Sequence, residues 1–235
     1  MKYIVDVTLD KINGVSVLQK RNGYRFSIDA VLLANFINLS YPKKIADFGA
    51  GSGIVGLLLA KRYATAEVTL IELQEDLFNL SRQNIELNGL LERVRAVHLD
   101  IRLIKESELV QNSYDLIVSN PPYRKPNSGR LSPNGERAVA RHETLLSVAE
   151  LIESAFYILR ARGRLVIIYH PCRFVEILEL LRKKRLEPKR VQFIHADLKS
   201  QAKMFLIEAV KEGKPDFTLE RPLFIYDKNG RYEAS

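Results

Sequence analysis

Apolar and polar residues change their spacing near residue 44 of this 235-residue chain. Before that point, residues 3–18 alternate apolar and polar side chains around Asn13-Gly14, a dipeptide that favours a two-residue β-hairpin turn. The next segment, residues 27–38, has apolar residues at helical spacing, and Ser27 is placed to cap a helix. We therefore expect residues 1–26 to form a small N-terminal β-hairpin flap, followed by a helix.

From Lys44 onward, short apolar runs alternate with segments that have helical periodicity. The pattern predicts strands at residues 45–48, 67–72, 94–99, 114–119, 165–169, 191–195 and 203–210. It predicts helices at residues 54–62, 75–88, 144–159 and 174–184. Alternation of this kind predicts an α/β domain over residues 27–235, with a doubly wound, mostly parallel sheet.

One segment, residues 124–143, interrupts this alternation and predicts a long loop. It contains two prolines and two glycines and has little apolar periodicity. Loops of this length inside compact domains are often functional lids, and the alternative is a disordered excursion. The loop is also basic, through Arg124, Lys125, Arg130, Arg137 and Arg141.

Composition limits the classes of protein that this chain can belong to. Hydrophobic residues make up 46% of the chain, which supports a real core and excludes a disordered protein. The formal net charge of +8 favours a polyanionic partner, although a basic protein without such a partner has the same composition. A single cysteine, Cys172, excludes an intrachain disulfide, and we expect it to be a small buried hydrophobe. No segment has the pattern of a signal peptide or a membrane span, so we expect a cytoplasmic protein.

A glycine-rich turn follows the first strand of the alternating region. Within Asp47–Gly53, Gly49, Gly51 and Gly53 allow a tight turn and close approach of the backbone to a ligand. The turn lacks the Lys-Ser/Thr ending of a P-loop, which disfavours triphosphate binding.

Two further acidic residues follow the next two strands. Glu72 lies 21 residues after Gly51, at a strand end where a carboxylate can accept hydrogen bonds from ribose hydroxyls. Asp100 ends the third strand and could accept a bond from an adenine amino group, although a helix cap is the stronger interpretation of Asp100 alone. The ordered set is the informative feature, because Asp47, the glycines, Glu72 and Asp100 all fall at strand ends.

This set resembles the class I S-adenosylmethionine methyltransferases. The resemblance implies that Asp47 and the glycines bind the amino acid end of the cofactor, Glu72 the ribose and Asp100 the adenine. It also implies a Rossmann-like sheet with an antiparallel last strand. An NAD-dependent dehydrogenase is the rival interpretation, and the next motif argues against it because dehydrogenases do not need that motif.

The rigid motif Asn120-Pro121-Pro122-Tyr123 follows the fourth strand. An exocyclic amino nitrogen is a poor nucleophile, because its lone pair is delocalised into the ring. The Asn120 side-chain oxygen and a backbone carbonyl, such as that of Pro121, can accept its two N–H bonds and favour a pyramidal nitrogen. The prolines fix this geometry, and Tyr123 offers a ring on which a base can stack. By itself, the motif could equally be a structural turn.

Segments outside these motifs resemble one particular family of methyltransferases. Residues 23–34, 132–137 and 140–143 are similar to bacterial valine-tRNA adenine-N6 methyltransferases. That resemblance implies an RNA substrate, methylated on the adenine next to the anticodon, and the cofactor S-adenosylmethionine. It places Ser27 and Asp29 near the methionine end of the cofactor; a helix cap and a first-turn acid are the alternative.

RNA binding is consistent with the basic loop, whose five cations would contact phosphates beside the target pocket. A second basic cluster, residues 182–190, could bind phosphates or be a solvated helix end. The rival functions are glutamine methylation of release factors, guanine-N2 methylation of ribosomal RNA, and non-catalytic RNA binding on the same fold. The sequence gives no reason to infer a membrane or an obligatory protein partner.

Overall fold

The computed structural model describes residues 7–21, 28–121 and 146–227, and every structural statement below refers to them. Its strands are β1 (Val7–Ile12), β2 (Val15–Lys20), β3 (Lys44–Phe48), β4 (Glu67–Glu72), β5 (Val94–His98), β6 (Tyr114–Ser119), β7 (Leu159–Tyr169), β8 (Leu186–His195), β9 (Ala202–Lys211), β10 (Thr218–Leu219) and β11 (Leu223–Phe224). The helices are α1 (Ile28–Phe36), α2 (Ile54–Arg62), α3 (Glu75–Leu87), α5 (Val148–Ile158) and α6 (Phe174–Lys183), with short 3-10 helices η1 (Ile101–Glu106) and η2 (Pro171–Arg173).

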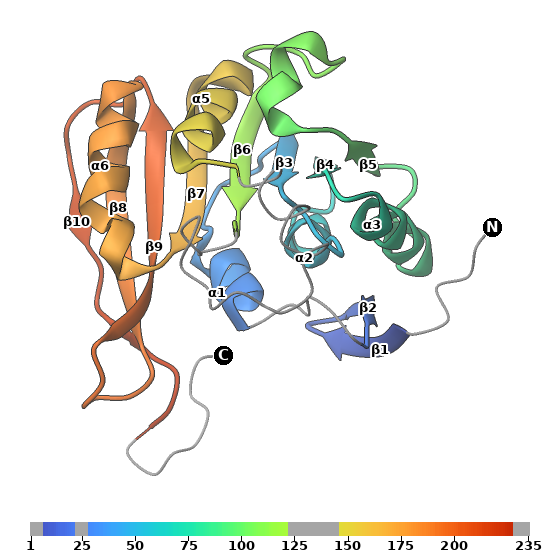
Figure 1. Cartoon of the computed structure of the whole chain (residues 1–235), viewed down its shortest axis with the longest axis horizontal. Coiled ribbons are helices and arrows are strands. Elements are labelled where there is room, and N and C mark those ends of the chain that lie inside the picture. Colours follow the sequence, from blue (N-terminus) through green and yellow to red (C-terminus); the bar gives the residue numbers. More distant parts are fainter. Residues whose placement is uncertain (1–6, 22–27, 122–145, 228–235) are drawn as a thin grey trace, which may run out of the picture.

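The main sheet confirms the predicted doubly wound architecture. Its strand order is β10-β8-β9-β7-β6-β3-β4-β5, and β11 pairs with β8 (Figure 1). The strands from β7 to β5 along this order are parallel, whereas β9 is antiparallel to both β7 and β8. After β3 the chain adds β4 and β5 on one side and later β6 and β7 on the other. This reversal beside β3 is the position at which such sheets bind ligands.

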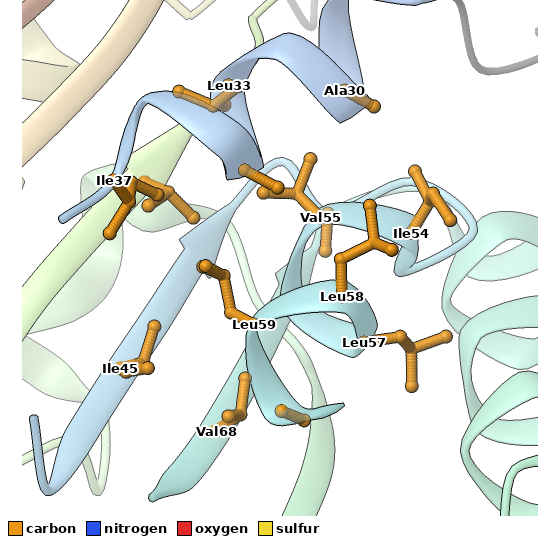
Figure 2. Packing of buried hydrophobic residues seen from close by; sticks show 14 of the residues in the cluster. Ala30, Leu33, Ile37, Ile45, Ile54, Val55, Leu57, Leu58, Leu59 and Val68 are labelled. Atoms are coloured by element: carbon orange, nitrogen blue, oxygen red, sulfur yellow. The ribbon is translucent and has the colours of Figure 1, made fainter. Parts of the chain in front are cut away.

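Two hydrophobic layers cover the sheet, one on each face. One layer combines α1, α2, the hairpin and alternate residues of the central strands. The other combines η1, α5 and α6 with the intervening residues of the same strands. Helix α2 is buried from Ile54 to Ala60, because it contacts the sheet, α1 and β2 at once. Figure 2 shows Val55 and Leu59 of α2 between Leu33 of α1 and Ile45 of β3.

The N-terminal hairpin forms as its turn dipeptide predicts. Asn13 and Gly14 both have positive φ, at 47° and 78°, and Ile12 pairs with Val15 across the two-residue turn. Val15 and Val17 are fully buried, so β2 is packed onto the domain through one face.

Several element boundaries differ from the prediction for local reasons. Strand β7 begins at Leu159 instead of Leu165, through the polar run Leu159–Arg164. Strand β8 begins at Leu186 and includes Pro188, which is tolerated because the β8–β9 register shifts there. Helix α5 begins at Val148, where Ser147 and Glu150 form a capping box.

The expectation that Cys172 is buried was wrong. It is exposed in η2, a tight turn that follows β7 and packs none of its residues into the core. The three histidines at residues 98, 170 and 195 each bond to a backbone group, in agreement with structural roles. Among the described helices, none is long and apolar enough to cross a membrane.

Candidate active site

Hydrogen bonds join the carboxyl ends of four parallel strands into one edge. The Gly49 and Ala50 N–H groups donate to the Ile71 carbonyl oxygen, at 2.9 and 3.0 Å, which ties the end of β3 to β4. The Leu99 N–H donates to the Glu72 carbonyl oxygen at 3.1 Å, which ties β5 to β4. On the other side, the Ser119 hydroxyl donates to the Phe48 carbonyl oxygen at 2.8 Å and ties β6 to β3. The predicted site residues at these strand ends therefore share one rigid frame.

The glycine turn needs residues without a Cβ atom. Gly51 has a φ of 57°, and its N–H points to the Glu72 carboxylate. Gly53 is the N-cap of α2 with a φ of 88°, and a Cβ there would lie 2.8 Å from the Leu70 Cδ1 atom. At Gly49, a Cβ would meet no atom within 4 Å, so the backbone faces open space. The turn thus combines a close-packed side with an accessible one.

Asp47 lies beneath this turn, with an exposed fraction of only 1%. Its Oδ2 atom accepts a hydrogen bond from the Gly56 N–H at 2.9 Å, which holds the first turn of α2 against β3. Burial raises the pKa of the Asp47 carboxyl to about 7, and the negative charge of Glu72 adds to this increase. Contact between Asp47 and a ligand ammonium stays a prediction.

Glu72 is held by the backbone through both carboxylate oxygens. Its Oε2 accepts from the Gly51 N–H and its Oε1 from the Gln74 N–H, each at 2.8 Å. A carboxylate has about four acceptor positions, so each oxygen can accept a further bond from a ligand hydroxyl. The structure therefore brings Asp47, the glycine turn and Glu72 together, with Glu72 oriented by the turn itself.

Electrostatics favour a cationic ligand at this place. Two acids, Asp47 and Glu72, lie in the buried floor of the turn, and the Glu72 charge opposes ionisation of Asp47. A ligand with positive charge would relieve this repulsion, whereas a pyrophosphate would add to it. This pair of acids thus fits a sulfonium and an ammonium better than a dinucleotide.

Asp100 caps η1 at the end of the edge beyond β5. Its Oδ1 accepts from the Arg102 N–H at 3.0 Å, and both oxygens accept from the Arg102 guanidinium. The Arg102 guanidinium holds the pKa of the Asp100 carboxyl below its usual range. The structure therefore confirms that Asp100 caps a helix, whereas its contact with an adenine stays a prediction.

The chemical motif begins where β6 ends. Asn120 is partly buried and Pro121 is buried, directly after the tie between Ser119 and Phe48. Asp29 is partly buried in the first turn of α1. The other predicted site residues lie outside the described residues, namely Ser27, Pro122, Tyr123, Arg124, Lys125, Arg130, Arg137 and Arg141.

Sequence reasoning missed the tie made by Ser119. The only available sign was a hydroxyl at the end of an apolar strand, which is too common to single out a residue.

The second basic cluster is largely neutralised: Arg182, Lys184 and Arg185 pair with Glu187, Glu153 and Glu212. It lies where α6 ends and β9 ends, which is the edge opposite the glycine turn. This pairing favours a solvated helix end for the cluster.

Comparison with known proteins assigns the fold and then the family. A predicted O-methyltransferase from Agrobacterium tumefaciens has the same fold, with a TM-score of 0.71 at 24% identity over 87% of this chain and 90% of that one. The family model of the methyltransferase small domain matches residues 25–192. The chain belongs to this methyltransferase family, and the match includes every strand-end residue described above.

Curated relatives of the chain share one name, tRNA1(Val) (adenine(37)-N6)-methyltransferase. The relative from Trichodesmium erythraeum is 33% identical over 66% of this chain, a match that spans 64% of the relative. The relative from Aliivibrio salmonicida is 29% identical over 88% of this chain and 86% of its own length. The match therefore covers somewhat less than two thirds of the first protein and most of the second.

The raised pKa of Asp47 predicts a pH dependence of stability. Between about pH 4 and pH 7 the carboxyl is ionised in the unfolded chain but protonated in the folded one, so the free energy of unfolding falls as pH rises through this window. Asp47→Asn keeps an oxygen that can accept from Gly56 and removes the titration. We expect the free energy of unfolding of the ligand-free wild type to fall between pH 4 and pH 8 by up to about 4 kcal/mol more than that of Asp47→Asn. Denaturant unfolding of both proteins at the two pH values measures this difference. Parallel pH profiles for the two proteins would contradict the buried position of this charge.

Proposed function

We propose that this protein transfers a methyl group from S-adenosylmethionine to the exocyclic N6 nitrogen of an adenine in tRNA, next to the anticodon. The observation that carries the proposal is the position of Asn120 and Pro121 at the end of β6, adjacent to the glycine turn of β3 in the same tied edge. The shared name of the curated relatives supports tRNA as the substrate. In this proposal, residues 27–235 are the catalytic domain and residues 1–26 its hairpin flap.

Binding of the cofactor is assigned to the strand ends. The open side of Gly49 admits the amino acid end of the ligand near Asp47, and Ser27 and Asp29 are assigned to its methionine end. Glu72 accepts the ribose hydroxyls on lone pairs that its bonds to Gly51 and Gln74 leave available. Asp100 accepts from the adenine amino group.

The residues of the Asn-Pro-Pro-Tyr motif act on the nitrogen that receives the methyl group. S-adenosylmethionine supplies an electrophilic methyl on a sulfonium. The Asn120 amide oxygen and the Pro121 carbonyl each accept one N–H bond of the adenine amino group, which favours a pyramidal nitrogen with its lone pair available. Transfer of this methyl would leave S-adenosylhomocysteine, and the proton released by the nitrogen would go to solvent water. Pro121 and Pro122 fix the backbone, and Tyr123 stacks on the base, so alignment carries much of the catalysis.

Binding of tRNA is assigned to the basic loop at residues 124–143, which directly follows the chemical motif. Its cations Arg124, Lys125, Arg130, Arg137 and Arg141 would contact phosphates and position the RNA. The cluster at residues 182–190 is excluded from this interface, because much of its charge is paired with acids at the opposite edge of the sheet. An anticodon-loop base is already partly unstacked, which lowers the cost of bringing it to the site. A substrate of this kind agrees with a cytoplasmic protein.

The substrate is tested by incubating the purified protein with methyl-labelled S-adenosylmethionine and bulk tRNA. Mass analysis of the digested nucleosides should show the label in N6-methyladenosine. Parallel reactions with a release factor and with ribosomal RNA should remain unlabelled. Transfer to a release-factor glutamine or to a ribosomal guanine, with none to tRNA, would overturn the proposed substrate.

The role of Asn120 is tested by Asn120→Ala. Because the amide oxygen acts on the acceptor nitrogen and not on the cofactor, the variant should bind S-adenosylmethionine as tightly as the wild type. Its single-turnover rate should fall at least about 100-fold, comparable to the loss of one key transition-state interaction. The exposed residue Asn38 provides a matched control, and Asn38→Ala should keep the wild-type rate. Turnover of Asn120→Ala at the control rate would remove this residue from the chemistry.

A further inference from the structure

Side-chain amides, not another strand, cover the outer edge of β2. The Asn88 Oδ1 accepts from the Ser16 N–H at 2.9 Å, and its Nδ2 donates to the Ser16 carbonyl at 2.7 Å. One helical turn earlier, the Asn84 Oδ1 accepts from the Leu18 N–H at 2.7 Å, and its Nδ2 donates to the Leu18 carbonyl at 3.0 Å. One amide in the last turns of α3 and one at its C-cap therefore reproduce the bonds of a neighbouring strand.

The rise per residue of the helix and of the strand allows both asparagines to reach β2. Four residues of helix rise about 6 Å, and two residues of strand rise about 7 Å. Asn84 consequently lies opposite Leu18 and Asn88 opposite Ser16, and the peptide groups of both strand residues face away from β1. The fully buried side chains of Val15 and Val17 hold the same strand against the core. The hairpin thus has one defined position on α3.

One of the two asparagines also reaches the glycine turn. The Asn84 Nδ2 donates a second bond, to the Ser52 carbonyl at 2.8 Å, and Asn84 is fully buried. Ser52 lies between Gly51, which binds the Glu72 carboxylate, and Gly53, which begins α2. The second Nδ2 bond of Asn88 goes instead to the Asn84 carbonyl of its own helix, at 2.7 Å.

The far end of β2 is also attached near the cofactor edge. The Lys20 ammonium pairs with the Asp76 carboxylate at 2.8 Å, in the first turn of α3. That turn directly follows Glu72 and Gln74, which form the ribose side of the proposed pocket. The hairpin is therefore attached both beside the glycine turn, through Asn84, and beside the proposed ribose side of the pocket, through Asp76.

We propose that Asn84 is a positioning residue that couples the N-terminal hairpin to the glycine turn, so that seating of β2 on α3 sets the shape of the cofactor pocket. The inference rests on the proposed function, because it assigns the ligand of that turn as S-adenosylmethionine. Asn84 does not touch the cofactor; it holds the Ser52 carbonyl and β2 with one amide group.

The two asparagines provide a matched pair of variants. Asn84→Ala and Asn88→Ala each remove three hydrogen bonds, and both remove a pair of bonds to β2. Both should lower the midpoint of thermal unfolding by a similar amount. Asn84→Ala should weaken the binding of S-adenosylmethionine by about 10-fold in calorimetric Kd, with kcat for tRNA within about twofold of the wild type. Asn88→Ala leaves the bond between Asn84 and Ser52 in place, so it should weaken binding by a clearly smaller factor. An equal change in Kd in the two variants, or no change in either, would overturn the coupling.

A second measurement needs no variant. Coupling is reciprocal, so the cofactor must stabilise the seating of the hairpin as much as that seating stabilises cofactor binding. Saturating S-adenosylmethionine should slow amide hydrogen exchange at Ser16 and Leu18 of the wild type by about 10-fold. These N–H groups bond to Asn88 and Asn84 and not to the glycine turn, so slower exchange would report the coupling. Unchanged exchange under saturation would refute the inference and leave the proposed function intact. Failure of S-adenosylmethionine to bind the wild type at all would refute the proposed function itself.

Discussion

The site depends on the hydrogen bonds that join the ends of the central strands. Because the last residue of β3 accepts a bond from Ser119 and the first two N–H groups of the glycine turn donate to Ile71, the turn has neighbours fixed on both sides. The Glu72 carboxylate then binds the Gly51 N–H, so the turn and the acid determine each other's position. Backbone hydrogen bonds of this kind hold the turn in one conformation, which lowers the ordering cost of binding.

The same edge gathers two buried acids in an otherwise basic protein. Asp47 and Glu72 are buried beneath the turn, while the chain as a whole has a net charge of +8. This separation suits two ligands of opposite charge: a cationic cofactor in the turn and a polyanionic substrate over the surface.

Much of this arrangement could be predicted from the sequence, because it depends on local chemistry. Asn13-Gly14 specifies its own turn, and a glycine cluster between an apolar strand and a helix specifies another. Other features depend on partners distant in sequence. Pro188 argues against a strand until the register shift opposite it is known, and Cys172 resembles a core residue until the turn around it is seen. The bonds of Asn84 to Leu18 and Ser52 cross 66 and 32 residues, and no local pattern encodes them.

The acids at this edge should select a cation and reject a pyrophosphate, and competitive calorimetry with S-adenosylmethionine and NAD⁺ measures this selection. We expect S-adenosylmethionine to bind with one-to-one stoichiometry. NAD⁺ should bind at least about 100-fold more weakly, because like charges placed together cost several kcal/mol. Equal affinities, or tighter binding of NAD⁺, would contradict the account.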